Sequence, residues 1–228
     1  MPDRGLTADG RLDQLVKTLE AARDPERAAG ASAYMRNQFP FLGIRLPALS
    51  ALLREVLQPG PGEAVAWAQA CWQLPEREYQ HAGMLALRRV AARLPPDCLS
   101  DLKGLIVSKS WWDTVDELAT HVVGTLVLQH PQLAAEMDRW IEESNIWVVR
   151  TAILHQERWK ARTDAERLFA YCRRRAGDRE FFIRKAIGWA LRSYAATDPL
   201  AVQRFVEENE ALSGLSKREA LRGVHRHL

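Results

Sequence analysis

Cysteine is scarce in this chain of 228 residues, and its positions do not suit metal or disulfide chemistry. The three cysteines, Cys71, Cys98 and Cys172, are widely spaced, and none belongs to a Cys-x-x-Cys pair. This pattern argues against a disulfide framework and a zinc site, and it predicts three buried or partly buried thiols in a reducing compartment. Long apolar runs and a secretory signal are also missing, so we expect a soluble intracellular protein.

The common signatures of cofactor-dependent and hydrolytic enzymes are missing too. The sequence has no Walker loop, no glycine-rich dinucleotide fingerprint, no HExxH motif and no nucleophile elbow. Its six histidines form no convincing metal-binding cluster. We therefore expect no cofactor and no metal.

Helix-forming residues are abundant, and apolar residues recur at helical spacing along almost the whole chain. Turn signals break the pattern into segments of roughly 10 to 20 residues, so about twelve helices fit. No Gly/Ser-rich linker divides the chain. The sequence therefore predicts an all-α fold and a single domain over residues 1–228, with residues 1–10 as a flexible tail.

An internal repeat is visible in the second half of the chain. Trp112, Trp147 and Phe182 are spaced 35 residues apart, each near the start of an apolar helix. A shift of 34 would instead align Asp116 with Arg150. The second helices of the repeats open at Pro131, Asp164 and Asp198. Helix pairs of this length are typical of a HEAT-like solenoid of about six repeats, whose curved concave face forms a groove for an elongated partner.

Charge is distributed unevenly along the chain. Residues 145–228 hold 17 Lys/Arg and 10 Asp/Glu, a net charge of +7, whereas residues 1–144 hold 15 and 19, a net charge of −4. The positive half could attract a polyanion. A solvated helix surface explains the same charges, and charge alone favours that simpler interpretation.

Residues 110–116 predict the start of a helix. Ser110 is a candidate cap, Asp113 is placed to reach back to it, and Trp111 lies at core spacing with the apolar positions that follow. Those positions are Val115, Leu118 and Val122.

Trp112 and Asp116 share a different face of that helix, four residues apart. This places an indole and a carboxylate side by side. Packing between helices for Trp112 and a surface ion pair for Asp116 are the structural alternatives.

Later repeats offer complementary groups. Arg150 lies one turn into a helix, while Phe182, Lys185 and Trp189 share a face of the next. Stacked repeats would bring these side chains and Asp116 to one groove. Core packing of Trp189 and solvent-exposed charges for Arg150 and Lys185 remain open alternatives.

Several motifs closely resemble those of AlkD-type DNA alkylation-repair glycosylases. They occur in the order of that family, from Tyr34 to the C-terminus. The motifs are residues 34–39 (YMRNQF), 41–44 (FLGI), 109–116 (KSWWDTVD), 145–147 with Arg150, 181–189 (FFIRKAIGW) and 215–220 (LSKREA).

The resemblance implies a curved right-handed α-α superhelix that binds duplex DNA and excises cationic N3- and N7-alkylated purines by hydrolysis of the N-glycosidic bond. It implies that the base stays in or near the stack instead of entering a deep pocket. By position, it implies catalytic roles for Asp116, Trp112 and Trp189. The candidates for DNA contact are Arg150, Lys185, Phe182, Lys109 and Tyr34.

The expected partner is double-stranded DNA containing alkylated bases. We expect the protein to bind it as a monomer, in the cytoplasm and associated with the nucleoid, and we expect no membrane binding. One alternative is a non-catalytic relative that binds DNA through the same groove, for which a carboxylate facing phosphates would be a disadvantage. Another is a solenoid scaffold for proteins, since fold alone does not fix function. A binding affinity that falls steeply with salt would separate DNA binding from the scaffold.

Overall fold

The computed structural model describes residues 8–54, 56 and 59–227, and these contain helices, turns and loops but no strand. Fourteen α-helices occur in this part of the chain, so the predicted all-α class is confirmed. Of the predicted tail, residues 1–7 lie outside the described residues, while residues 8–10 form the first turn of α1. The described residues form two compact units, 1–94 and 95–228. The single domain over 1–228 stays a prediction.

The first unit holds five α-helices, α1 to α5, packed on an apolar core. Leu15, Leu19, Leu42, Trp67 and Cys71 belong to this core, and each is at most 2% exposed. The helices are α1 (Ala8–Ala21), α2 (Pro25–Tyr34), α3 (Leu46–Leu52), α4 (Ala64–Gln73) and α5 (Arg77–Val90).

A buried carboxylate holds the loop between α2 and α3. Glu78 accepts hydrogen bonds from the backbone N–H groups of Leu42, Gly43 and Ile44, at 2.8, 2.8 and 3.0 Å. Gly43 has φ +91°, and a Cβ there would lie 2.2 Å from the carbonyl oxygen of Asp24. Glycine is therefore required at this turn.

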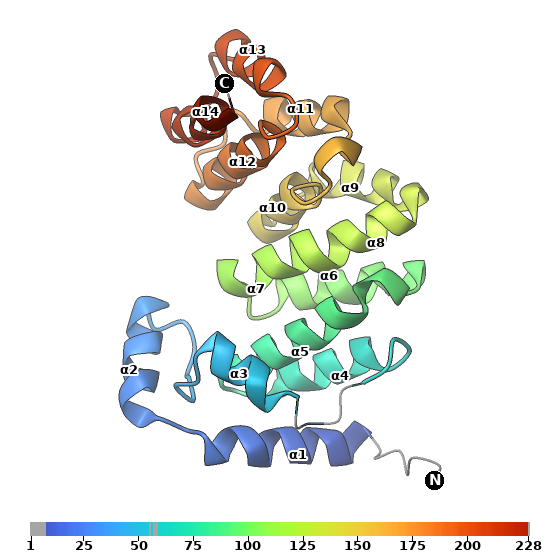
Figure 1. The fold of residues 1–228 in the computed structure, drawn as a ribbon, viewed down its shortest axis with the longest axis vertical. Coiled ribbons are helices and arrows are strands. Elements are labelled where there is room, and N and C mark those ends of the chain that lie inside the picture. Colours follow the sequence, from blue (N-terminus) through green and yellow to red (C-terminus); the bar gives the residue numbers. More distant parts are fainter. Residues whose placement is uncertain (1–7, 55, 57–58, 228) are drawn as a thin grey trace. The chain divides into compact units, whose positions relative to one another are not determined.

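The second unit stacks helices in consecutive pairs (Figure 1). One row contains α7, α10, α12 and α14, in which each helix packs on the next, and the other contains α9, α11 and α13. The bounds are α6 (Leu99–Val107), α7 (Trp112–Glu117), α8 (Gly124–Gln129), α9 (Ala134–Trp140), α10 (Ile146–Leu154), α11 (Ala165–Arg174), α12 (Phe181–Tyr194), α13 (Pro199–Glu208) and α14 (Gly214–His227).

Local capping chemistry starts the second helices where the sequence predicts. The side chain of Asp164 accepts from the backbone N–H of Arg167 at 3.0 Å, and that of Asp198 accepts from Ala201 at 2.8 Å. Each aspartate thereby satisfies a backbone donor that the first turn leaves without a partner.

The remaining features fit the composition. The three cysteines are free and buried, as expected. None of the helices in residues 8–227 that the structure describes is long and apolar enough to cross a membrane.

Candidate functional site

The site is built where three repeats meet, at α7, α10 and α12. Asp116, Arg150 and Lys185 are each the fifth residue of their helix, counted from Trp112, Ile146 and Phe181. The repeats are thus offset by 34 and then 35 residues, and Asp116 pairs with Arg150 at the equivalent position of the next helix. The register that aligns Asp116 with Arg150 is the one that the structure uses.

The helix that carries Asp116 begins one residue later than predicted. Its N-cap is Trp111, in an extended conformation (φ −158°), and no side chain caps the helix. The hydroxyl of Ser110 instead donates to the carbonyl of Ile106, at 2.7 Å, and so closes the end of α6. The predicted capping role of Ser110 is therefore wrong, because the preceding helix offers its hydroxyl a free carbonyl.

Asp116 and Arg150 form a two-pronged ion pair. Arg150 donates from Nε to Oδ1 at 2.6 Å and from Nη2 to Oδ2 at 2.7 Å. Its remaining Nη1 donates to the carbonyl oxygen of Phe182 in α12. The guanidinium therefore links α7, α10 and α12 through a single planar group, which lysine could not do.

Burial makes this pair unlike an exposed surface bridge. The Arg150 side chain is 1% exposed and that of Asp116 is 20% exposed. Burial raises the pKa of Asp116 above its ordinary value, and the hydrogen bonds and charge of Arg150 act against that rise. Neither of the structural alternatives, a solvated charge for Arg150 or a plain surface ion pair for Asp116, describes this geometry.

The indole of Trp189 lies against the same guanidinium. The Cζ of Arg150 is 5.4 Å from the ring centroid, and Lys185 Nζ and Arg192 Cζ are 5.5 and 5.7 Å away. Three cations thus surround one electron-rich ring, an arrangement that marks Trp189 as a cation-binding face. Trp189 is half-buried, so core packing alone does not account for it.

Glu219 of α14 balances the cations next to Trp189. Its carboxylate is 5% exposed and pairs with Lys185 at 2.9 Å, Arg192 at 2.8 Å and Arg222 at 3.0 Å. The hydrogen bond from Lys185 is the main reason that the pKa of Glu219 is lowered. Lys185 is therefore partnered within the protein, and Glu219, a residue of the 215–220 motif, joins the site with a role that the sequence did not indicate.

Three aromatic side chains form a cluster beside the ion pair. Trp111 lies 5.8 Å from Trp147 and 5.3 Å from Phe182, and the last two are 4.8 Å apart between ring centroids. All three are half-buried. Trp111 is thus packed, as expected, but in this edge cluster instead of on the apolar stripe of α7, because it stands before the helix.

The other predicted site residues occupy varied positions. Trp112 is the half-buried first residue of α7, one turn before Asp116, so the two share a side of the helix as predicted. Lys109 adopts a left-handed backbone (φ 48°) and is half-buried. Tyr34 ends α2 in the first unit and is 74% exposed. The roles of these residues stay predictions.

A π-helical turn, Leu118–Val123, follows the carboxylate directly. The hydroxyl of Thr120 donates to the carbonyl of Asp116 at 2.9 Å, and the indole of Trp159 donates to that of Gly124 at 3.0 Å. A Cβ at Gly124 would lie 2.1 Å from the carbonyl oxygen of His155. The wider turn and the glycine thus let the α10 end approach this helix closely, and such turns are frequent at functional sites.

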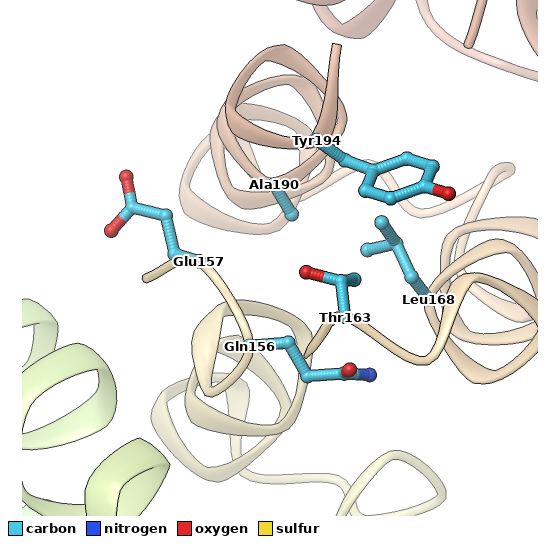
Figure 2. A pocket seen from close by; sticks show the side chains of 6 residues that line it. All are labelled: Gln156, Glu157, Thr163, Leu168, Ala190 and Tyr194. Atoms are coloured by element: carbon cyan, nitrogen blue, oxygen red, sulfur yellow. The ribbon is translucent and has the colours of Figure 1, made fainter. Parts of the chain in front are cut away.

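A second carboxylate, Glu157, lies after the end of α10, where the charge of Asp116 acts on it. Ser193 of α12 donates to it at 3.3 Å. Figure 2 shows the Glu157 carboxylate pointing away from the crevice between Leu168 and Tyr194. Burial raises the pKa of Glu157, and the negative charge of Asp116 raises it further. No motif in the sequence indicated this residue.

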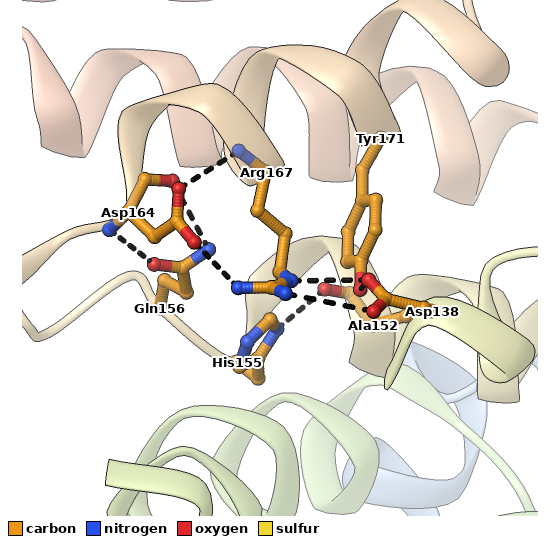
Figure 3. A network of polar contacts seen from close by, with 7 residues as sticks. All are labelled: Asp138, Ala152, His155, Gln156, Asp164, Arg167 and Tyr171. Carbon is orange, nitrogen blue, oxygen red and sulfur yellow. Dashed lines mark hydrogen bonds and ion pairs between the residues drawn. The ribbon is translucent and has the colours of Figure 1, made fainter. Parts of the chain in front are cut away.

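A polar network lies between α9, α11 and the C-terminal end of α10 (Figure 3). Arg167 and Tyr171 of α11 donate to Asp138 of α9 at 3.0 and 2.6 Å. The Nδ1 of His155 donates to the carbonyl of Ala152, and burial lowers the pKa of His155 to about 4. The bonds to Asp138 join α11 to α9 beside the C-terminal end of α10.

Comparison with known proteins identifies the family. Residues 15–224 match the family model described as DNA alkylation repair enzyme. The chain belongs to this family. It is also similar to the solved structure of a predicted DNA alkylation repair enzyme from Enterococcus faecalis, with a TM-score of 0.78 and 31% identity, covering 87% of this chain and 94% of that chain. No curated protein sequence matches. The family indicated by the sequence motifs is thereby confirmed, with DNA as the substrate that it implies.

Proposed function

We propose that this DNA alkylation repair protein is a DNA glycosylase that hydrolyses the N-glycosidic bond of cationic N3- and N7-alkylated purines in duplex DNA. The observation that supports this most directly is the half-buried carboxylate of Asp116, held by Arg150 beside the indole of Trp189. A carboxylate on a surface that only binds phosphates would weaken binding. The same carboxylate is favourable where positive charge develops on a sugar during the reaction.

An alkylated purine that already carries a positive charge is a good leaving group, so no strong general acid is needed. As the bond breaks, positive charge builds on the sugar, and a rate gain requires that this charge be bound more tightly than the ground state. Asp116 stabilises the charge and orients the attacking water. Trp112 and Trp189 offer their ring faces to the same cation.

The remaining parts of the proposal concern DNA. Arg150 holds the backbone near the lesion, while Lys185, Phe182, Lys109 and Tyr34 contribute further contacts. The lesion is recognised while the base stays in or near the stack, so that departure depends on the charge of the base itself. Uncharged lesions such as uracil are then not substrates, and uracil release at a rate near that of 7-methylguanine would contradict this part.

The deciding experiment incubates the protein with methylated duplex DNA and identifies the free bases by chromatography. We expect 7-methylguanine or 3-methyladenine to be released, and the Asp116→Asn variant to lose most of the excision rate, about 100-fold or more, while it keeps its DNA affinity. Normal excision by Asp116→Asn would remove the catalytic assignment. Binding of DNA without any base release would identify a non-catalytic relative.

A further inference from the structure

Hydrolysis of a cationic alkylpurine nucleotide leaves one proton to be placed. The water oxygen bonds to the sugar carbon, and the electron pair of the broken C–N bond neutralises the departing base. One O–H bond of the water must then break, and its proton needs an acceptor. A positioned base contributes most when its carboxylate is free to receive that proton.

Asp116 is poorly suited to that task. Both of its oxygens already accept hydrogen bonds from Arg150, at 2.6 and 2.7 Å. The pair is electrically balanced, and protonation of Asp116 would break contacts to a guanidinium that is 1% exposed. Asp116 is therefore held as a fixed negative charge that orients the reactants, and a carboxylate outside such an ion pair is better suited to take the proton.

Glu157 lies close to this pair without being neutralised in the same way. Ser193 is one turn beyond Trp189 on α12, and it donates to Glu157 at 3.3 Å, while Trp189 itself meets Arg150. The two cross-links between α12 and the chain of α10 therefore run side by side. They place the Glu157 carboxylate one turn along α12 from the indole, where it feels the negative charge of Asp116.

The charged groups around Glu157 come from each element packed on it. Asp116 of α7 repels its charge, whereas the neighbouring Arg158 and Arg192 of α12 attract it. Arg192 is already paired with Glu219 at 2.8 Å, and within the described residues no ion pair joins either arginine to Glu157. The hydroxyl of Ser193 makes one long hydrogen bond, to Oε1 of Glu157, which leaves the other carboxylate oxygen to accept a proton.

We propose that Glu157 is the proton acceptor of the reaction, receiving the proton that the attacking water loses and passing it to solvent. This inference rests on the proposed glycosylase function. It divides the work between two carboxylates, with Asp116 fixed by Arg150 as the electrostatic partner of the sugar and Glu157 as the base. The raised pKa of Glu157 agrees with that role, because a carboxylate with a higher pKa is a stronger base and takes a proton more readily.

The test is the pH dependence of single-turnover release of 7-methylguanine from a duplex oligonucleotide between pH 5 and 9. The variants are Glu157→Gln, the conservative Glu157→Asp, and Glu166→Gln as a control that removes an exposed charge of the same unit. For Glu157→Gln we expect a rate about 100-fold lower at neutral pH, at the low end for a general base. The part of the acid-side fall that comes from protonation of Glu157 should be absent from the profile of Glu157→Gln.

The controls separate this proposal from the others. Glu157→Asp should recover part of the rate, and Glu166→Gln should behave as wild type. If the wild-type protein releases no base, the glycosylase function fails first. If it does release base and Asp116→Asn does not, an unchanged profile for Glu157→Gln overturns the role of Glu157 alone. A uniform rate loss at every pH, with lowered thermal stability, would likewise overturn it in favour of a structural role.

Discussion

Replacement of Arg150 by methionine removes the group that holds both oxygens of Asp116 and leaves a carboxylate that is only 20% exposed. Methionine fills similar space, so packing is largely kept. Removal of one partner from a buried ion pair costs about 3–5 kcal/mol, because the other charge stays desolvated. Since Asp116 keeps some contact with solvent, we expect a loss of about 3 kcal/mol in the free energy of unfolding at pH 8.

The pH dependence of that loss tests its cause. Burial already raises the pKa of Asp116 against the opposing effect of Arg150, so the pKa rises further once Arg150 is gone. A carboxyl whose pKa is higher in the folded than in the unfolded state destabilises the fold only above its unfolded pKa. The penalty grows with pH and is complete above the folded pKa.

The assay is urea unfolding of the wild type and of Arg150→Met at pH 4 and pH 8. Every other titrating group that the two proteins share cancels in the difference between them. We expect the difference to be clearly smaller at pH 4 than at pH 8. Equal differences at the two pH values would refute the reasoning, because they would assign the loss to packing and to the bond with Phe182.

Four other predictions concern pH, close packing, helix propensity and DNA binding. The pKa of His155 is about 4 in the folded protein, against an ordinary value of 6.5. The free energy of unfolding therefore keeps the contribution of neutral His155 above pH 6.5 and loses about 3 kcal/mol of it as the pH falls to 4. The non-titrating variant His155→Gln should flatten this part of the stability–pH curve. Gly124→Ala should cost about 3 kcal/mol in thermal or urea unfolding, because its Cβ meets a carbonyl oxygen at 2.1 Å. Gly104→Ala, in a helix with open space around it, should stabilise by about 1 kcal/mol. Affinity for duplex DNA should fall steeply between 50 and 200 mM salt, and an affinity that ignores salt would favour a protein scaffold.

Local chemistry explains the features that could be predicted from the sequence. Asp164 and Asp198 start their helices because a carboxylate can cap a backbone N–H within three residues, and this depends on no other repeat. The 3.6-residue spacing likewise predicts the buried side of α7, where Val115 is fully buried. The pairing of Asp116 with a cation one repeat later also follows from a periodic sequence, once the 34-residue register is chosen.

Features that depend on a neighbouring repeat could not be predicted in the same way. Ser110 has the chemistry of an N-cap, yet the end of α6 provides a carbonyl that its hydroxyl bonds instead. Glu157 follows the end of α10 and belongs to no sequence motif. Its proposed role rests on its hydrogen bond with Ser193 and on the charge of Asp116, both in adjoining repeats. The π-helical turn needs the close approach of α10 at Gly124, which no helix propensity encodes.

The proposed roles of Arg150 place two demands on one guanidinium. All three of its nitrogens donate within the protein, to Asp116 and to the carbonyl of Phe182, and the side chain is 1% exposed. The guanidinium has five N–H groups, so one on each Nη remains available for a phosphate oxygen once the DNA backbone reaches this buried side chain. A phosphate bound there would draw part of the positive charge of Arg150 away from Asp116. The carboxylate would then be less neutralised when a cationic sugar forms beside it, which would couple backbone binding to catalysis through the same side chain.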